Sequence, residues 1–300
     1  MKRHVLASAV IGATACSDAQ AAPLSPSYDF SRAIAAYALS NSAPPGANDW
    51  SCRPSASHPR PVVLVHGTGA NMALSWQAVS PELRNRGFCV FALNYGRVGG
   101  ASLGALAPVS RSARQLAVFV DQVLDRTGAE KVDIVGHSQG GMMPRQYLRF
   151  EGGATKVGTL VGLASSNYGI GRDPGPEARL PTPTELFLQR QASVFCGACV
   201  DQTAGSLFLR RLNEGSDTVP GVRHVVIQTR YDQIVAPYTN ALLRGPGAEN
   251  ILVQDGCEQD RVDHAAIAYD RRAVGYVVRV LDPAETSSVP CTRARPWVGG

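Results

Sequence analysis

A serine between two glycines lies where the chain passes from a short apolar stretch into a helical pattern. The apolar stretch Lys131–Val135 leads into Gly136-His137-Ser138-Gln139-Gly140, and an amphipathic pattern follows without a linker. A strand, Gly-x-Ser-x-Gly and a helix in this order form a sharp turn that exposes the serine hydroxyl. The glycines leave room where strand and helix cross, and the free N–H groups at the helix start favour an oxyanion. The pattern predicts that Ser138 is a nucleophile.

The same five-residue pattern occurs a second time, at Gly100-Ala101-Ser102-Leu103-Gly104. No strand pattern precedes this copy, and nearby Gly96 and Gly99 predict a flexible loop. We therefore assign the nucleophile to Ser138 and interpret Ser102 as a loop residue.

A serine hydroxyl becomes a good nucleophile only when a base takes its proton and a third group orients that base. After this kind of turn the acid comes next in the chain and the histidine last. Among the six histidines, His264 follows the last strand pattern and precedes the last helical pattern, so we expect it to be the base.

The acid should lie on a loop that can reach His264. Asp232 follows the penultimate strand pattern directly and is our candidate. Asp255 and Asp260 are the alternatives. Asp263 is the sequence neighbour of the histidine, and adjacent residues rarely meet side chain to side chain.

The negative charge that develops on the substrate needs two preorganised N–H donors. One is the backbone N–H of Gln139, next to the nucleophile. The other should come from the loop after the apolar stretch Val62–Val65, where Thr68 is the candidate. The Thr68 hydroxyl could supply a third hydrogen bond.

The elements that must position these residues alternate along the chain. Short apolar stretches predict strands, and the segments between them have helical periodicity. This pattern predicts an α/β fold with a mostly parallel sheet covered by helices on both faces. The predicted strands are 61–65, 89–93, 131–135, 159–164, 224–228 and 250–254, and the predicted helices are 31–39, 80–86, 112–127, the segment after Ser138, 184–195 and 271–281.

One long insertion interrupts the alternation. Residues from 165 to about 204 contain no strand pattern and several prolines. The insertion leaves the edge of the sheet where ligands bind in such folds, so we expect a lid or a wall of an acyl pocket. The predicted organisation is a signal peptide at 1–22, an N-terminal extension at 23–50 and one domain at 51–300.

The N-terminus has the composition of a secretory signal peptide. Lys2 and Arg3 precede an apolar run, and Ala19-Gln20-Ala21 predicts cleavage after Ala21 or Ala22. We expect a secreted protein; a lipoprotein acylated at Cys16 is the alternative. No other stretch is long and apolar enough to be a transmembrane segment.

Apart from Cys16, which lies in the expected signal peptide, the chain has six cysteines. This even number indicates disulfides in an oxidising compartment. No strand leads into Cys196-Gly-Ala-Cys199 and no second ligand pair has metal spacing, so a local disulfide is favoured over a redox or zinc site. The predicted pairs are Cys52–Cys89, Cys196–Cys199 and Cys257–Cys291.

Composition limits the classes of function. With 44% hydrophobic and 18% charged residues, the chain suits one globular domain with a sizeable core. The net charge is +5, but the basic residues are scattered without a stripe, so we expect no nucleic-acid partner. No cluster of metal ligands is visible, and we expect no metal, no organic cofactor and a monomer.

Several longer segments resemble the secreted bacterial triacylglycerol lipases of the α/β-hydrolase superfamily, of the class 2 type. These segments are PVVLVHGTGAN, VDIVGHSQGGMMPRQYL, KVGTLVGLASSN, CGACVDQTAGSLFLRRLN, TRYDQIVAPYT and DHAAIAYD, and the similarity extends from about Trp50 to Leu281. The resemblance implies an α/β-hydrolase fold and the same five site residues. It also implies secretion, disulfides and fatty-acid esters as substrates, with transient contact at a lipid–water interface.

Two alternatives share this machinery or this fold. A polyester or cutin-type hydrolase would use the same residues with an open groove. A catalytically silent binding protein normally lacks one of the three catalytic residues, and all three candidates are present here.

Overall fold

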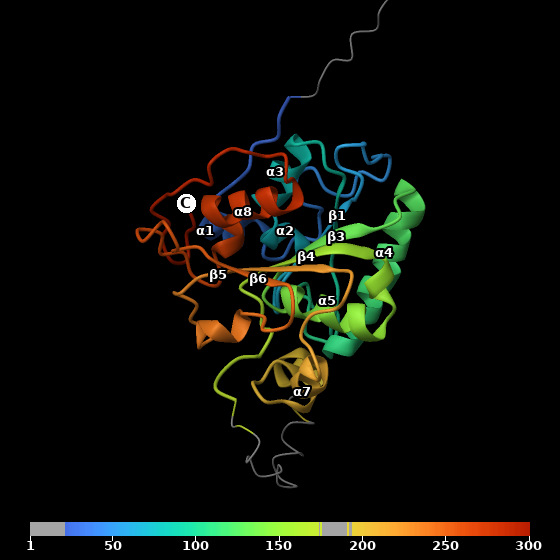
Figure 1. The fold of residues 1–300 in the computed structure, drawn as a ribbon, viewed down its shortest axis with the longest axis vertical. Helices are drawn as coiled ribbons and strands as arrows, with labels where there is room; N and C mark the ends of the chain where they lie inside the picture. The colour runs from blue at the N-terminus through green and yellow to red at the C-terminus, as the bar shows by residue number, and fades with distance from the viewer. Residues whose placement is uncertain (1–21, 174, 176–190, 192–193) are drawn as a thin grey trace, which may run out of the picture.

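The structure is a computed structural model that describes residues 22–173, 175, 191 and 194–300 (Figure 1). The expected signal peptide lies almost entirely outside the described residues. So does most of the helix expected at 184–195, although residues 194–201 are helical.

The centre of the fold is one parallel sheet, as the alternating pattern predicted. Its six strands have the order β2-β1-β3-β4-β5-β6, and every neighbouring pair is parallel. The strands are β1 (Val62–Val65), β2 (Val90–Leu93), β3 (Val132–His137), β4 (Val157–Leu163), β5 (Arg223–Gln228) and β6 (Ala248–Leu252).

Helices cover both faces of this sheet (Figure 1). Successive strand residues point to opposite faces, so β1 contributes Val62 and Leu64 to one core and Val63 and Val65 to the other. The first core is covered by α1 (Phe30–Tyr37), α2 (Met72–Ser75), α3 (Val79–Asn85) and α8 (Arg271–Leu281). The second is covered by α4 (Val109–Thr127), α5 (Gln139–Phe150) and α7 (Leu207–Asn213).

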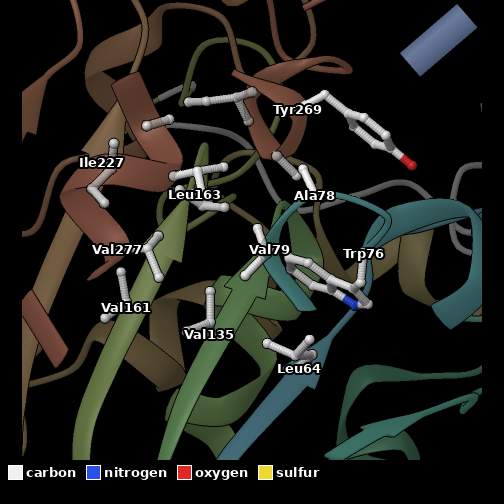
Figure 2. Packing of buried hydrophobic residues seen from close by; sticks show 14 of the residues in the cluster. Leu64, Trp76, Ala78, Val79, Val135, Val161, Leu163, Ile227, Tyr269 and Val277 are labelled. Atoms are coloured by element: carbon white, nitrogen blue, oxygen red, sulfur yellow. The ribbon is translucent and has the colours of Figure 1, made fainter. Parts of the chain in front are cut away.

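The first core is packed around a buried tryptophan. Figure 2 shows Trp76 among Leu64, Val79 and Val135, with Tyr269 and the α8 residue Val277 nearby. Burial of such side chains is the main favourable contribution to folding, roughly 25 cal/mol for each Å² of apolar surface removed from water.

Some element boundaries differ from the sequence prediction. Strand β6 ends at Leu252, so Val253 and Gln254 belong to the following turn, and α4 begins at Val109 instead of residue 112. Helices α2 and α7 were not predicted. Helix α2 has four residues, too few for helical periodicity to show. Asn71 and Ser206 cap α2 and α7 with their side chains.

The strand order places one position at the sheet edge as the natural ligand site. From β1 the chain moves outward to β2 and then returns to β3 on the other side of β1. The loops after β1 and β3 therefore diverge at the carboxyl ends of the strands and leave a crevice between them. Thr68 follows β1 and Ser138 follows β3.

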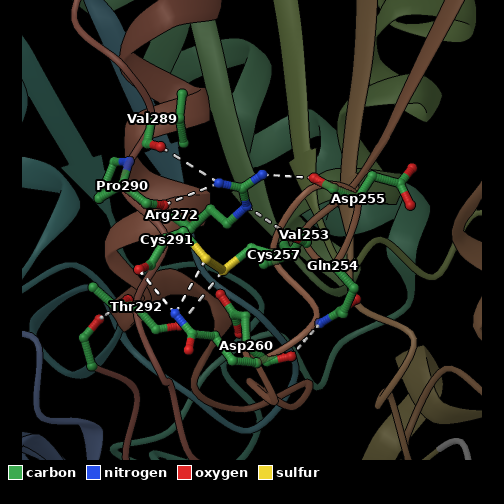
Figure 3. Close-up of a disulfide and its surroundings, with 12 residues drawn as sticks. Val253, Gln254, Asp255, Cys257, Asp260, Arg272, Val289, Pro290, Cys291 and Thr292 are labelled. Carbon is green, nitrogen blue, oxygen red and sulfur yellow. Dashed lines mark hydrogen bonds between the residues drawn. A yellow bond between two sulfur atoms is a disulfide. The ribbon is translucent and has the colours of Figure 1, made fainter.

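Three disulfides join the predicted pairs, Cys52–Cys89, Cys196–Cys199 and Cys257–Cys291. The last one attaches the C-terminal segment after α8 to the loop that precedes His264 (Figure 3). None of the helices in the described part of the chain combines the length and the hydrophobicity that crossing a bilayer requires.

Candidate active site

Ser138 occupies the sharp turn between β3 and α5. Its backbone has φ 56° and ψ −121°, a strained conformation for a residue with a side chain. The turn is held from inside the sheet, because the Ser138 N–H donates to the carbonyl of Leu163 at the end of β4 at 2.9 Å. The surrounding structure therefore maintains a geometry that the local backbone alone would avoid.

The flanking glycines permit the close crossing of strand and helix. A Cβ added at Gly136 would lie 1.8 Å from the carbonyl oxygen of Gly140, and one added at Gly140 would lie 2.0 Å from that of Val65. Both obstacles are backbone atoms, which cannot rotate away as a flexible side chain can.

We expect Gly140→Ala to lower the free energy of unfolding by at least about 3 kcal/mol, because the added methyl group displaces the end of β1. Urea denaturation measures the effect. Gly275→Ala in α8 is the matched control, since its Cβ would meet side-chain atoms of Pro290 and Val289 at 3.2 and 3.3 Å. That variant gains helix propensity and should stay within about 1 kcal/mol of the wild type. Equal losses in both variants would contradict the close-crossing argument.

The structure brings His264 and Asp232 together with Ser138. The His264 Nε2 atom lies 3.0 Å from Ser138 Oγ, and its Nδ1 atom lies 2.9 Å from Asp232 Oδ2. The side chain of Asp232 is fully buried and that of His264 is 8% exposed, so water screens these interactions weakly. Three residues that follow β3, β5 and β6 in the chain thus form one hydrogen-bonded chain.

Asp232 is held in place through both of its oxygens. Its Oδ1 atom accepts from the backbone N–H groups of Ile234 and Val235 at 2.9 and 2.7 Å. Its Oδ2 atom accepts from Gln228 Nε2 at 3.2 Å in addition to His264. The carboxylate can therefore face the imidazole in only one orientation.

The other candidate acids are engaged elsewhere. Asp255 forms an ion pair with Arg230 at the surface, at 2.6 Å. Asp260 is buried and accepts from the N–H of Val262. Asp263 accepts from Gln233 and from two backbone N–H groups, and it does not contact the imidazole of its neighbour.

His137, which sequence analysis did not single out as functional, supports the loop of His264. Its Nε2–H donates to the backbone carbonyl of His264 at 2.8 Å. Burial, together with the nearby His264, lowers the pKa of His137 to about 3. The ring is therefore neutral at physiological pH, which suits a donor to a carbonyl.

Thr68 and Gln139 lie on either side of Ser138, at the end of β1 and the start of α5. The Gln139 N–H is in the first turn of α5, where the helix supplies no acceptor. No hydrogen bond of the Thr68 N–H to any described residue is present. The Thr68 hydroxyl donates to Gln139 Oε1 at 2.6 Å, so it is not aimed at a substrate as a third donor in this structure.

Gln202, also not identified from the sequence, connects these two loops to the insertion. Its Nε2 atom donates to Thr68 Oγ1 at 2.8 Å, and its Oε1 atom accepts from Ser166 Oγ at 2.8 Å. The side chains of Gln202 and Ser166 are buried. A polar residue in an otherwise irregular segment carries no sequence signal of such a role, because its partners are far away in the chain.

A cavity of about 470 Å³ opens above Ser138 and His264. Its wall is mostly apolar, and the described part of the insertion contributes Ile170, Gln202 and Thr203. The larger apolar side chains around it are Phe30, Leu74, Ile170, Ile234, Tyr269 and Trp297. Within the described residues, no group of three or more His, Cys, Asp or Glu side chains could hold a metal ion.

The family model of the class 2 lipases matches residues 59–273, which include all of the residues in this hydrogen-bonded chain. The chain belongs to the class 2 lipase family. Two of the residues that line the cavity, Phe30 and Trp297, lie outside the matched range.

Two curated triacylglycerol lipases, from Pseudarthrobacter phenanthrenivorans and Burkholderia plantarii, are each 37% identical to this chain over 90 residues. The aligned part is 28% of this chain, and the chain spans only about a quarter of the length of these relatives, 27% and 24%.

Solved structures are similar in fold. Aspergillus fumigatus lipase B superposes with a TM-score of 0.58 and 16% identity, over 83% of this chain and 56% of that chain. The mature form of a Bacillus licheniformis lipase superposes with a TM-score of 0.54 and 15% identity, over 77% and 94%. This chain therefore has the α/β-hydrolase fold.

Proposed function

We propose that this protein is a secreted serine ester hydrolase, a triacylglycerol lipase or carboxylesterase, in which Ser138, His264 and Asp232 form the catalytic triad. The contact of His264 with both other residues, at 3.0 and 2.9 Å, is the observation that carries this proposal. Family membership and the fold support an ester substrate.

The proposed reaction is acyl transfer through a serine ester. Ser138 Oγ attacks the ester carbonyl carbon while His264 Nε2 takes its proton, and Asp232 stabilises the imidazolium. The N–H groups of Thr68 and Gln139 hold the oxyanion. The C–O bond to the alcohol then breaks as His264 returns the proton to it, and water repeats the sequence to release the acid and free Ser138.

Fatty-acid esters are the substrate class that the cavity suits best. Its apolar wall can bind an acyl chain by excluding water, while the polar groups near Ser138 orient the ester. The relatives named triacylglycerol lipases support the same class. Three disulfides support export, because such bonds persist in oxidising compartments.

Hydrolysis of p-nitrophenyl butyrate, p-nitrophenyl palmitate and emulsified triolein tests this proposal, with Ser138→Ala as the blank. Serine-dependent activity on palmitate and triolein is the expected result. Activity on butyrate alone would indicate a short-chain esterase and would make polyesters the next substrates. No activity in either protein would favour the binding-protein alternative.

We expect Gln202→Leu to lower kcat about tenfold with little change in KM. Its amide holds Thr68 and Gln139, so the two oxyanion donors lose their fixed spacing, and an indirect loss should cost less than removal of a donor. Steady-state hydrolysis of p-nitrophenyl butyrate measures both constants. Gln77→Leu is the matched control, because Gln77 is also buried but does not line the cavity, and its amide donates to the Ala73 carbonyl. A kcat loss in Gln77→Leu as large as in Gln202→Leu would contradict the role of the amide.

A further inference from the structure

Two buried carboxyl groups bracket the segment that carries His264. Asp260 precedes the histidine and Asp270 follows it at the start of α8, and neither residue is exposed to solvent. One oxygen of each has a backbone partner. Asp260 Oδ1 accepts from the Val262 N–H at 3.0 Å, and Asp270 Oδ2 accepts from the Ala273 N–H at 2.6 Å.

The other oxygen of each group has no donor. Asp260 Oδ2 and Asp270 Oδ1 are fully enclosed, and no described residue donates a hydrogen bond to them. The two carboxyl groups instead act on each other, because a side-chain hydrogen bond between them lowers the pKa of Asp260 and raises that of Asp270. Two carboxylate oxygens are both acceptors, so they can bond only when one of the groups carries a proton.

No described basic side chain forms an ion pair with either carboxyl group, and each accepts a hydrogen bond from a backbone N–H group. Arg272 is the one charged group that lowers the pKa of Asp260 among the described residues. Its guanidinium, however, donates to the carbonyls of Val253, Asp255 and Pro290 (Figure 3). It also donates to the Tyr276 hydroxyl. Arg272 therefore links the C-terminal segment to the turn after β6 through these hydrogen bonds.

We propose that Asp260 and Asp270 share one proton in the folded protein, and that this carboxyl–carboxylate hydrogen bond closes the loop that positions His264. Two like charges this close in a buried site cannot both persist without a large cost. Burial and the charge of Asp260 raise the pKa of Asp270 to about 7, and burial raises that of Asp260. The effect on catalysis rests on the role proposed above for His264.

The shared proton makes stability depend on pH. An unfolded aspartate loses its proton near pH 3.8, whereas the folded pair keeps one up to about 7. The folded state therefore holds an extra proton between these values, and the free energy of unfolding decreases as pH rises through this window. Above it the pair is doubly charged, the loop loosens, and His264 is held less well over Ser138.

Asp270→Asn tests the proposal, because an amide can cap α8 with its oxygen and donate to Asp260 with its nitrogen without any shared proton. Asp29→Asn is the matched control, since Asp29 caps α1 in the same way but is partly exposed, and its side-chain partners are Ser31 and Arg32. Asp260→Asn is the second test if the first variant does not fold.

We expect the wild-type thermal midpoint to fall by about 5 °C or more from pH 5 to pH 8, and Asp270→Asn to show less than half of this fall. In infrared spectra recorded at pH 6, the wild type and Asp29→Asn should show a protonated-carboxyl band that Asp270→Asn lacks. The ratio of kcat at pH 9 to kcat at pH 7 should be about threefold higher in Asp270→Asn than in the wild type.

Parallel pH profiles and the absence of that band would overturn the shared proton. So would a calcium-dependent rise of the thermal midpoint in the wild type that Asp270→Asn abolishes, because the two oxygens would then hold a cation. Neither the infrared band nor the thermal midpoint needs an active enzyme. A protein that shows both effects but hydrolyses no ester would contradict the proposed function and leave the proton pair intact.

Discussion

Replacing Ser138 by alanine should lower kcat for p-nitrophenyl butyrate by at least about 10⁴-fold. The Ser138 hydroxyl oxygen forms the proposed acyl bond, and it lies 3.0 Å from His264 Nε2. The alanine methyl group cannot replace it as a nucleophile. The proposed oxyanion donors and the cavity would still bind the ester, but no covalent intermediate could form. Steady-state and single-turnover kinetics on the purified variant measure the loss.

Ser102→Ala is the matched control for this experiment, because Ser102 lies in the second Gly-x-Ser-x-Gly of the chain. It lies in the loop between β2 and α4, away from the end of the strand, and does not line the cavity above Ser138. We expect its kcat to stay within about twofold of the wild type, as for surface substitutions away from a site. Both variants should keep the wild-type circular dichroism spectrum. Full activity of folded Ser138→Ala would remove the nucleophile from this turn.

Replacing Asp232 by asparagine should lower kcat by about 10³- to 10⁴-fold with the fold preserved. Two backbone N–H groups donate to Oδ1, so the amide oxygen of the new side chain must take that position. Its NH₂ group then faces His264 Nδ1, which must become the acceptor. The proton of the imidazole moves to Nε2 and points at Ser138, where a base is needed.

The pH–rate profile of kcat/KM and the thermal midpoint, measured on the same preparation, separate this tautomer effect from unfolding. Asp255→Asn is the control, since Asp255 was an alternative acid but lies in an exposed ion pair with Arg230. Its kcat should change by less than about twofold, because exposed pairs contribute little. An equal loss in Asp255→Asn, or none in Asp232→Asn, would require a different acid.

The sequence determined much of the frame, because the relevant signals are local. Each buried strand appears as a short apolar run, and α4 and α8 have helical periodicity over several turns. The strand–turn–helix context of Ser138 distinguished it from Ser102 without any tertiary information. The three predicted cysteine pairs agree with the disulfides of the structure.

Only the tertiary structure decided which groups meet. Asp232, Asp255 and Asp260 all lie on loops at the same side of the sheet, and their distances to His264 depend on how the loops after β5 and β6 fold over β3. The buried hydrogen bonds of Gln202 and His137 join segments that are far apart in the chain. The proposed pairing of Asp260 with Asp270 depends on how the loop between them folds. Side-chain hydrogen bonds of this kind leave no periodic pattern in a single sequence, because they depend on loop geometry that packing sets after the strands and helices have formed.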